Sequence, residues 1–241
     1  MKQTGKTTKE WFKNWANEYD QTLGKVKRHH KLLELMVEIS NVKEDDTVLD
    51  IGCGTGLLSL KFLKKNNCRI VGVDNSKYMF TIFEDKIKKL SLADKITCKL
   101  EDVVSLSSKK NSFDIVASSV TLHHVKNKYP VIRKIHNILK PSGRFVLGDI
   151  DMDTTGNIKS PTRLLRIMDC LKHEYALALE EGGVDAFVRM YDNGKKHILN
   201  EGEYCIDFQQ WRQLCQRAGF RKIKVKPLPE FKWFKVLVAV K

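Results

Sequence analysis

The sequence predicts an α/β fold in which helices cover both faces of a largely parallel sheet. Short apolar stretches alternate with helical patterns from residue 47 to residue 150. The first stretch leads directly into a glycine loop, residues 52–56, and then into an apolar helical pattern. An aspartate stands at or just beyond the end of each of the first three stretches. Together these observations are typical of a doubly wound, Rossmann-like sheet.

Two helices are expected before the first strand. Trp11, Trp15 and Tyr19 recur every four residues and predict a helix over residues 8–22 with one aromatic face. We interpret this face either as a packing surface or as a lid that closes over a ligand. Residues 30–40 predict a second helix, which is amphipathic.

Seven strands are expected in the sheet. The last two are joined by a short link that contains two prolines, residues 227–229, so we expect the last strand to be antiparallel. The seven strands are expected at residues 47–51, 69–74, 96–100, 113–119, 144–149, 221–225 and 233–240.

A helical insertion is expected between the fifth and sixth strands, where the alternation breaks. Ser160 and Pro161 predict the start of a helix that Gly182 and Gly183 end, and residues 184–191 predict a further helical segment. The apolar face of the first helix is expected to consist of Leu164, Leu165, Met168, Leu171 and Tyr175. We therefore expect a single domain, residues 1–241, with a helical lid at 1–42, a ligand-binding core at 43–150, a helical substrate cap at 151–206 and completion of the core at 207–241.

The composition favours a cytoplasmic protein with a well-formed core. The hydrophobic content is 42%, no apolar run approaches membrane-spanning length, and the basic N-terminus lacks the apolar segment of a secretory signal. The six cysteines are scattered without a Cys-x-x-Cys pair, which predicts reduced thiols and no metal site. The net charge of +14 is unevenly distributed, and we interpret it as a lysine-rich solvated shell rather than as a nucleic-acid surface.

Three carboxylates are expected to converge on one crevice, because the carboxyl ends of parallel strands meet at one edge of a sheet. Asp74 is placed to accept hydrogen bonds from ribose hydroxyls, and Asp102 from the exocyclic amine of a base. Asp50, beside the glycine loop, suits an ammonium group. The loop contains no lysine or arginine, which disfavours a diphosphate. The predicted ligand is a nucleoside at one end and cationic at the other.

The ordered motifs resemble those of the class I S-adenosylmethionine-dependent methyltransferases. They are VLDIGCGTG, the acid of VGVD, the Glu-Asp pair after the third strand, FDIVASSVTLHHV and LKPSGRFVLGD. The greatest similarity is to the ubiquinone- and menaquinone-biosynthesis branch and related small-molecule methyltransferases, which the segments 16–20 and 218–220 also resemble. The resemblance covers about residues 11–150 and 207–241 and fails over residues 151–206.

The resemblance implies that S-adenosylmethionine is the cofactor, and it implies a role for each matching residue. Gly52 and Gly54 would approach the methionine part of the cofactor, and Asp50 would lie near its amino group, unless Asp50 only fixes the loop. The remaining assignments are Asp74 at the ribose, Asp102 with Val103 at the adenine, and Ser119 near the sulfonium, with Asn75 as a further cofactor-binding residue.

Methyl transfer is an in-line displacement in which the protein aligns the reactants and excludes water. A general base is needed only if the acceptor must lose a proton. His123 is expected to face the cleft while His124 packs or is solvated, and His197 in the cap is the second candidate base, unless it is a surface histidine. Tyr19 is a candidate lid residue, because an aromatic face can lie against a sulfonium cation.

Three other functions remain open at this point. The net charge favours an RNA methyltransferase. However, the fourth strand ends in SSVTLHH and not in the Asn/Asp-Pro-Pro-Tyr/Phe motif that resembles that of enzymes which methylate base nitrogens. A NAD-dependent dehydrogenase is disfavoured because the loop reads Gly-x-Gly-x-Gly. A non-catalytic cofactor-binding protein is the third. The expected function is methyl transfer to a small-molecule acceptor.

Overall fold

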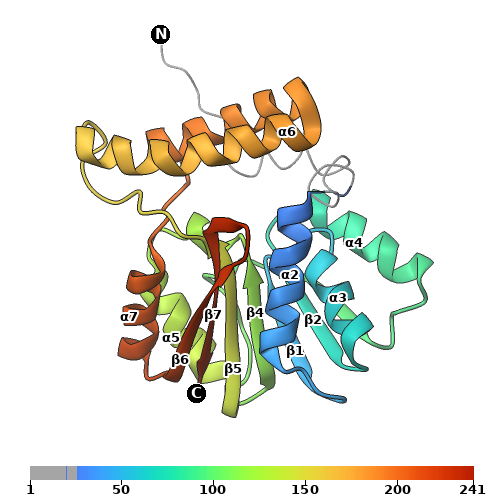
Figure 1. Cartoon of the computed structure of the whole chain (residues 1–241). Helices are drawn as coiled ribbons and strands as arrows, with labels where there is room; N and C mark the ends of the chain where they lie inside the picture. The colour runs from blue at the N-terminus through green and yellow to red at the C-terminus, as the bar shows by residue number, and fades with distance from the viewer. Residues whose placement is uncertain (1–19, 21–25) are drawn as a thin grey trace.

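The computed structural model describes residue 20 and residues 26–241 of the chain (Figure 1). The helix expected over residues 8–22, with Trp11, Trp15 and Tyr19, lies outside these residues except for Asp20. Within the described residues, no helix is both long enough and apolar enough to cross a bilayer.

The sheet has seven strands in the order β3-β2-β1-β4-β5-β7-β6. The first five pair in parallel, and β7 is antiparallel to both β5 and β6, so the predicted fold class is confirmed. β5 begins at Leu139, before the expected start at residue 144, because an irregularity in its pairing with β4 accommodates Pro141 and Ser142. The strands are β1 Thr47–Ile51, β2 Arg69–Asp74, β3 Ile96–Leu100, β4 Phe113–Ser119, β5 Leu139–Ile150, β6 Arg221–Leu228 and β7 Phe231–Val240.

Helices cover both faces of the sheet, as Figure 1 shows. Adjacent strand residues such as Val48 and Leu49 point to opposite faces, so the central strands contribute to two separate apolar layers. α2, α3 and α4 pack on the Val48 face, and α5 and α7 pack on the Leu49 face. The helices on the sheet are α2 Lys27–Ser40, α3 Leu57–Lys65, α4 Lys77–Lys89, α5 Lys128–Ile138 and α7 Phe208–Ala218, with a short 3-10 turn, η2 Leu122–His124, between β4 and α5.

The cap is a helical hairpin, α6 Pro161–Leu199, which lies across the top of the sheet in Figure 1. Gly183 has φ 68° and ψ −164°, a conformation that interrupts the helix, so the break predicted at the glycine pair is present. The second arm continues to Leu199, beyond the predicted residues 184–191. Arg163, which is 2% exposed, joins the two arms by donating hydrogen bonds to the carbonyls of Thr154, His197 and Ile198.

The buried face of the first arm differs from the predicted one. Leu165 is 71% exposed and Met168 is 37% exposed, whereas Ile167 and Leu171 are buried. The buried face also includes Arg163 and Glu174, because buried hydrogen bonds and a buried ion pair compensate these polar groups. Glu174 pairs with Arg28 of α2 at 2.6 Å, which connects the cap to the sheet-covering layer.

Candidate functional site

A cavity of about 880 Å³ lies at the carboxyl ends of the strands. The loops that follow β1, β2, β3 and β4 form most of its wall, and residues of α2 and α5 complete it. This is the position at which ligands bind in open α/β sheets. All the expected cofactor residues within the described part of the chain lie on this wall: Asp50, Gly52, Gly54, Asp74, Asn75, Asp102, Val103 and Ser119.

The glycine loop is shaped by two different constraints. Gly52 has φ +69°, and a Cβ atom there would lie 2.2 Å from the Thr121 side chain, so packing against Thr121 requires this glycine. Gly54 has φ +53°, and a Cβ atom there would meet nothing within 4 Å. The open side of Gly54 therefore leaves the backbone accessible to a ligand in the cavity.

Asp74 holds the glycine loop in place. Its two carboxylate oxygens accept hydrogen bonds from the backbone N–H groups of Gly54 and Ser76, each at 2.8 Å. Burial raises the pKa of Asp74, although these hydrogen bonds oppose the shift. Asp74 thus links β2 to the loop after β1, and it does so on the cavity wall.

Asp102 occupies the equivalent position one strand further along the sheet. Its side chain accepts hydrogen bonds from the backbone N–H of Val104 at 2.9 Å and from Nδ2 of Asn75 at 3.0 Å. Val103 lies beside it on the wall. Asn75 and Asp102 therefore connect the ends of β2 and β3 and give this part of the cavity a row of hydrogen-bonding groups.

Asp50 lies beneath the loop and is 1% exposed. The hydroxyl of Ser59 donates a hydrogen bond to its Oδ2 at 2.6 Å. Burial raises the pKa of Asp50 to about 7, the Ser59 hydrogen bond opposes that shift, and the nearby Asp74 adds to it. A cation in the cavity would favour the ionised form, so Asp50 both fixes α3 and offers a negative charge to a cationic ligand.

Ser119 places an unsatisfied hydroxyl on the cavity wall. Its Oγ is buried and has no hydrogen-bond partner among the described residues. An unpaired buried hydroxyl is costly unless a ligand or water satisfies it. Together with the open side of Gly54 and the carboxylates at the strand ends, this hydroxyl fits a nucleoside ligand that also carries an amino acid group.

The sequence analysis did not identify Asp20, the one described residue from the N-terminal segment before residue 26, as a residue of the site. Asp20 accepts a hydrogen bond from Oγ1 of Thr55 in the glycine loop at 2.6 Å and forms an ion pair with Lys86 of α4. Lys86 also donates to the Thr55 carbonyl. The signal was present in the sequence, because Asp20 directly follows Tyr19 in a segment that matches the resembled family.

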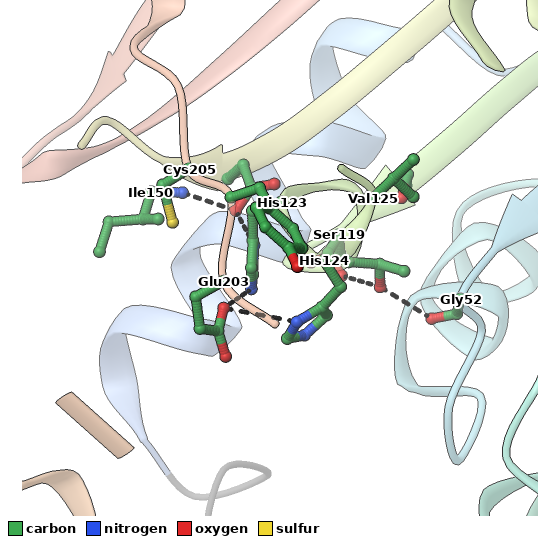
Figure 2. Close-up of polar contacts among 12 residues, drawn as sticks. Gly52, Ser119, His123, His124, Val125, Ile150, Glu203 and Cys205 are labelled. Atoms are coloured by element: carbon green, nitrogen blue, oxygen red, sulfur yellow. Dashed lines mark hydrogen bonds and ion pairs between the residues drawn. The ribbon is translucent and has the colours of Figure 1, made fainter. Parts of the chain in front are cut away.

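Three histidines surround one carboxylate at the edge of the cavity, as Figure 2 shows in part. Oε2 of Glu203 lies 3.2 Å from Nε2 of His123, 3.4 Å from Nδ1 of His124 and 3.8 Å from Nδ1 of His197. Nδ1 of His123 also donates a hydrogen bond to Asp149 at 2.7 Å. The sequence analysis missed both Glu203 and Asp149, because α6 and β5 bring them to η2 from distant parts of the chain.

The orientation expected for the two adjacent histidines is wrong. His124 lies on the cavity wall, whereas His123 lies behind it and is 5% exposed. The reason is the hydrogen bond to Asp149, which turns His123 toward β5. His197 is 6% exposed and packs against Glu203 and Cys205, so it is not a surface histidine. Whether His123 or His197 acts as a base stays a prediction.

The three histidines of this cluster differ in pKa. Burial disfavours protonation of His123, but the carboxylates of Asp149 and Glu203 outweigh it and raise the pKa of His123 to about 10. Burial lowers the pKa of His124 and of His197 to about 4. Burial disfavours ionisation of Glu203, but the three histidines hold its pKa at about 2. In the absence of other cations, His123 is the charged ring.

Comparisons with known proteins agree with this geometry. Residues 49–147 match the family described as "Methyltransferase domain". The chain is 29% identical over 119 residues to the 27-O-demethylrifamycin SV methyltransferase of Amycolatopsis mediterranei, covering 49% of this chain and 44% of that protein. It is 31% identical over 120 residues to the demethylmenaquinone methyltransferase of Lactobacillus johnsonii, covering 49% of each chain. The matched region thus spans less than half the length of these relatives.

The fold is shared with solved methyltransferases. Phosphoethanolamine N-methyltransferase 2 of Haemonchus contortus, solved with phosphomonomethylethanolamine and S-adenosylhomocysteine, superposes with a TM-score of 0.72 at 16% identity. The alignment covers 99% of this chain and 59% of that one. Residues 49–147 therefore match the methyltransferase domain family, and the chain as a whole shares the fold of this solved methyltransferase.

Proposed function

We propose that this protein transfers a methyl group from S-adenosylmethionine to a small-molecule acceptor. The observation that carries the proposal is the single cavity wall on which the open glycine backbone, Asp74, Asp102 and the unpaired Ser119 hydroxyl meet. A cavity of about 880 Å³ lies in the size range of small-molecule sites.

The cofactor would be held by residues at the ends of four neighbouring strands. Asp74 and Asn75 would bind the ribose, Asp102 and Val103 the adenine, and Gly52 and Gly54 the methionine part. Asp50 would attract the amino group and Ser119 would lie near the sulfonium. S-adenosylmethionine, when bound, supplies the methyl group. The chain itself orients the acceptor and excludes water from the cavity.

The acceptor would lie on the His124 side of the cavity, under the cap. His124 and Lys126 line this side, and the 200–206 segment that leads out of α6 packs against η2. Both curated relatives described above are named for small molecules, a rifamycin and a menaquinone precursor. Their names support a small-molecule acceptor over RNA.

The first test is binding and turnover with purified full-length protein. S-adenosylhomocysteine is expected to raise the melting temperature while NAD is not, because binding to the native state stabilises it. A panel of small hydroxyl, amine and quinol acceptors with methyl-labelled S-adenosylmethionine then identifies the acceptor class. Stabilisation by NAD alone would contradict the assignment of the cofactor. A tRNA filter-binding assay over a salt series would reveal an RNA substrate by its steep salt dependence.

Replacement of His123 by alanine is expected to lower turnover about 100-fold, the scale of a misplaced catalytic group, because the charged ring no longer holds Glu203 beside His124. The affinity for S-adenosylhomocysteine should change little. The physical reason is that His123 lies behind His124 and away from the cofactor side of the cavity. Steady-state kinetics and calorimetry measure the two effects separately. His136→Ala on α5, outside the cluster, is the control variant. The opposite pattern, weaker cofactor binding with unchanged turnover, would remove His123 from catalysis.

The affinity for S-adenosylmethionine is expected to fall as the pH is lowered below about 7, the pKa of Asp50. Below this pH the empty site holds a protonated Asp50, and binding of an ammonium group must release that proton. The dissociation constant should therefore rise by up to about tenfold per pH unit. Calorimetry in buffers of different ionisation enthalpy measures the proton release directly. Asp50→Asn should abolish this dependence, and a wild-type affinity that is independent of pH would contradict the contact.

A further inference from the structure

We propose that Glu203 and the histidines around it bind one divalent transition-metal ion, with Zn²⁺ as the best match to the ligand chemistry. His124 is the member of this site that lines the cavity assigned to the cofactor, and the proposal does not depend on methyl transfer. Imidazole and carboxylate groups are the ligands that Zn²⁺ takes in proteins. The side chains of His123, His124 and Glu203 each offer one ligand atom, and these atoms all lie within 4.8 Å of one another.

The distances within the cluster fit a metal site better than a hydrogen-bond network. Ligands of a tetrahedral ion with bonds of about 2.0–2.1 Å are separated by about 3.3 Å. Oε2 of Glu203 lies 3.2 Å from Nε2 of His123 and 3.4 Å from Nδ1 of His124. The same oxygen is buried but has no hydrogen bond of ordinary geometry from the described residues. A cation beside this oxygen would satisfy it.

The surroundings orient the rings as the outer groups of a metal site do. Asp149, which is fully buried, accepts a hydrogen bond from Nδ1 of His123 and thereby directs Nε2 toward Glu203. Metal-binding histidines typically donate their second ring N–H to a carboxylate in this way. Nδ1 of His124, which faces Glu203, also lies 3.1 Å from the Gly202 carbonyl oxygen and would exchange that hydrogen bond for the ion.

Further donors lie beside this cluster. Nδ1 of His197 is 3.8 Å from the same Glu203 oxygen, and Sγ of Cys205 is 3.6 Å from that nitrogen. His197, Glu203 and Cys205 are all buried and form a second set of ligand atoms within 4.8 Å, which shares only Glu203 with the first set. We therefore assign His123, His124 and Glu203 as the protein ligands and a water molecule as the fourth. The ion would then join the 200–206 segment to η2.

The site also has a consequence for the chemistry at the cavity edge. Coordination uses the imidazole lone pairs that a proton acceptor needs, so a metal-loaded cluster would meet an acceptor as an electrophile and not as a base. His124 is the member of the cluster on the cavity wall. No spacing in the sequence indicates this site, because its ligands come from residues 123–124 and from residue 203.

The test uses full-length protein purified without a histidine tag, saturated with Zn²⁺, dialysed against metal-free buffer and analysed by mass spectrometry of the metal. Wild-type protein is expected to retain about one equivalent, whereas Glu203→Gln and His124→Gln should retain less than about a tenth of that. Glu201→Gln, on the same segment and exposed, is the matched control and should bind as the wild type does. No metal in the wild type, or equal metal in Glu203→Gln, would overturn the proposal.

A second measurement needs no variant and decides the question if Glu203→Gln fails to fold. Wild-type protein loaded with Co²⁺ is expected to show the intense visible absorption of a tetrahedral ion, and one equivalent of Zn²⁺ should remove it. Zn²⁺ should also raise the melting temperature, because it binds the native state. A weak spectrum typical of hydrated Co²⁺ that Zn²⁺ does not change would overturn the proposal.

Discussion

Replacement of Asp74 by alanine is expected to raise the dissociation constant of S-adenosylhomocysteine at least tenfold, a loss of about 1.4 kcal/mol or more. Two effects act in the same direction. The variant loses the carboxylate that we assign to the ribose hydroxyls, and it loses the hydrogen bond that fixes the Gly54 N–H. Calorimetric titration of the purified variant measures the change, and an unchanged constant would contradict the ribose assignment.

A ligand analogue separates the two effects of Asp74. S-adenosylhomocysteine that lacks the ribose 2′-hydroxyl should bind the wild type more weakly, whereas the Asp74→Ala variant should bind both ligands about equally. This double-mutant logic isolates the contact from the loop effect. Asp94→Ala, an exposed aspartate between α4 and β3, is the matched control and should behave as the wild type. Equal discrimination by wild type and Asp74→Ala would assign Asp74 to the loop alone.

Replacement of Arg28 by methionine is expected to lower the free energy of unfolding by about 3–5 kcal/mol. The ion pair between Arg28 and Glu174 is buried, with side chains 11% and 4% exposed, so removal of the cation leaves an uncompensated buried carboxylate. Oε1 of Glu174 already has no hydrogen-bond partner among the described residues, so no other contact would stabilise the carboxylate after the loss of Arg28. Urea denaturation followed by circular dichroism measures the loss.

Two further variants test whether the buried charge is the cause. The double variant Arg28→Met/Glu174→Leu removes both charges and should be much less destabilised than the single variant, because apolar pairs can replace buried ion pairs. Lys27→Met, the neighbouring position, breaks an ion pair with Glu230 whose side chains are 59% and 54% exposed. It should cost about 1 kcal/mol or less. A double variant as unstable as the single one would assign the effect to packing.

The core of the fold could be predicted because its signals are local. The glycine loop, the capping serine before α4 and the apolar runs of β1–β4 each determine a short element by neighbouring residues alone. The positions of Asp74 and Asp102 follow from the rule that parallel strands end at one edge. For the same reason the cofactor wall could be proposed before the structure was known, and all of its described residues lie on the cavity.

The cap could not be predicted at the same level, because its buried face is chosen by distant partners. Arg163 and Glu174 are buried since carbonyls of the second arm and Arg28 of α2 compensate them, and this displaces Leu165 and Met168 to the surface. The orientation of His123 has the same origin. Its partner Asp149 is at the end of β5, and no pattern within residues 119–125 contains that information.

The two ends of the cap leave the sheet at one point. Asp151 follows β5, and its carboxylate accepts a hydrogen bond from the backbone N–H of Phe208 at the start of α7. The N–H of Thr154 donates to the Cys205 carbonyl, so the outgoing and returning chains run side by side. The cap between residues 154 and 205 therefore begins and ends where these two hydrogen bonds hold the outgoing and returning chains together.

Because its two ends are held together at one point, the cap can be replaced as a unit. A longer, shorter or unrelated segment between residues 154 and 205 would leave the register of β5 with β7 unaltered. That register depends only on residues outside this segment. The matched family domain ends at residue 147, inside β5 and before the junction. The hairpin can thus be lengthened, shortened or replaced while the matched domain and the sheet that carries the cavity keep their structure.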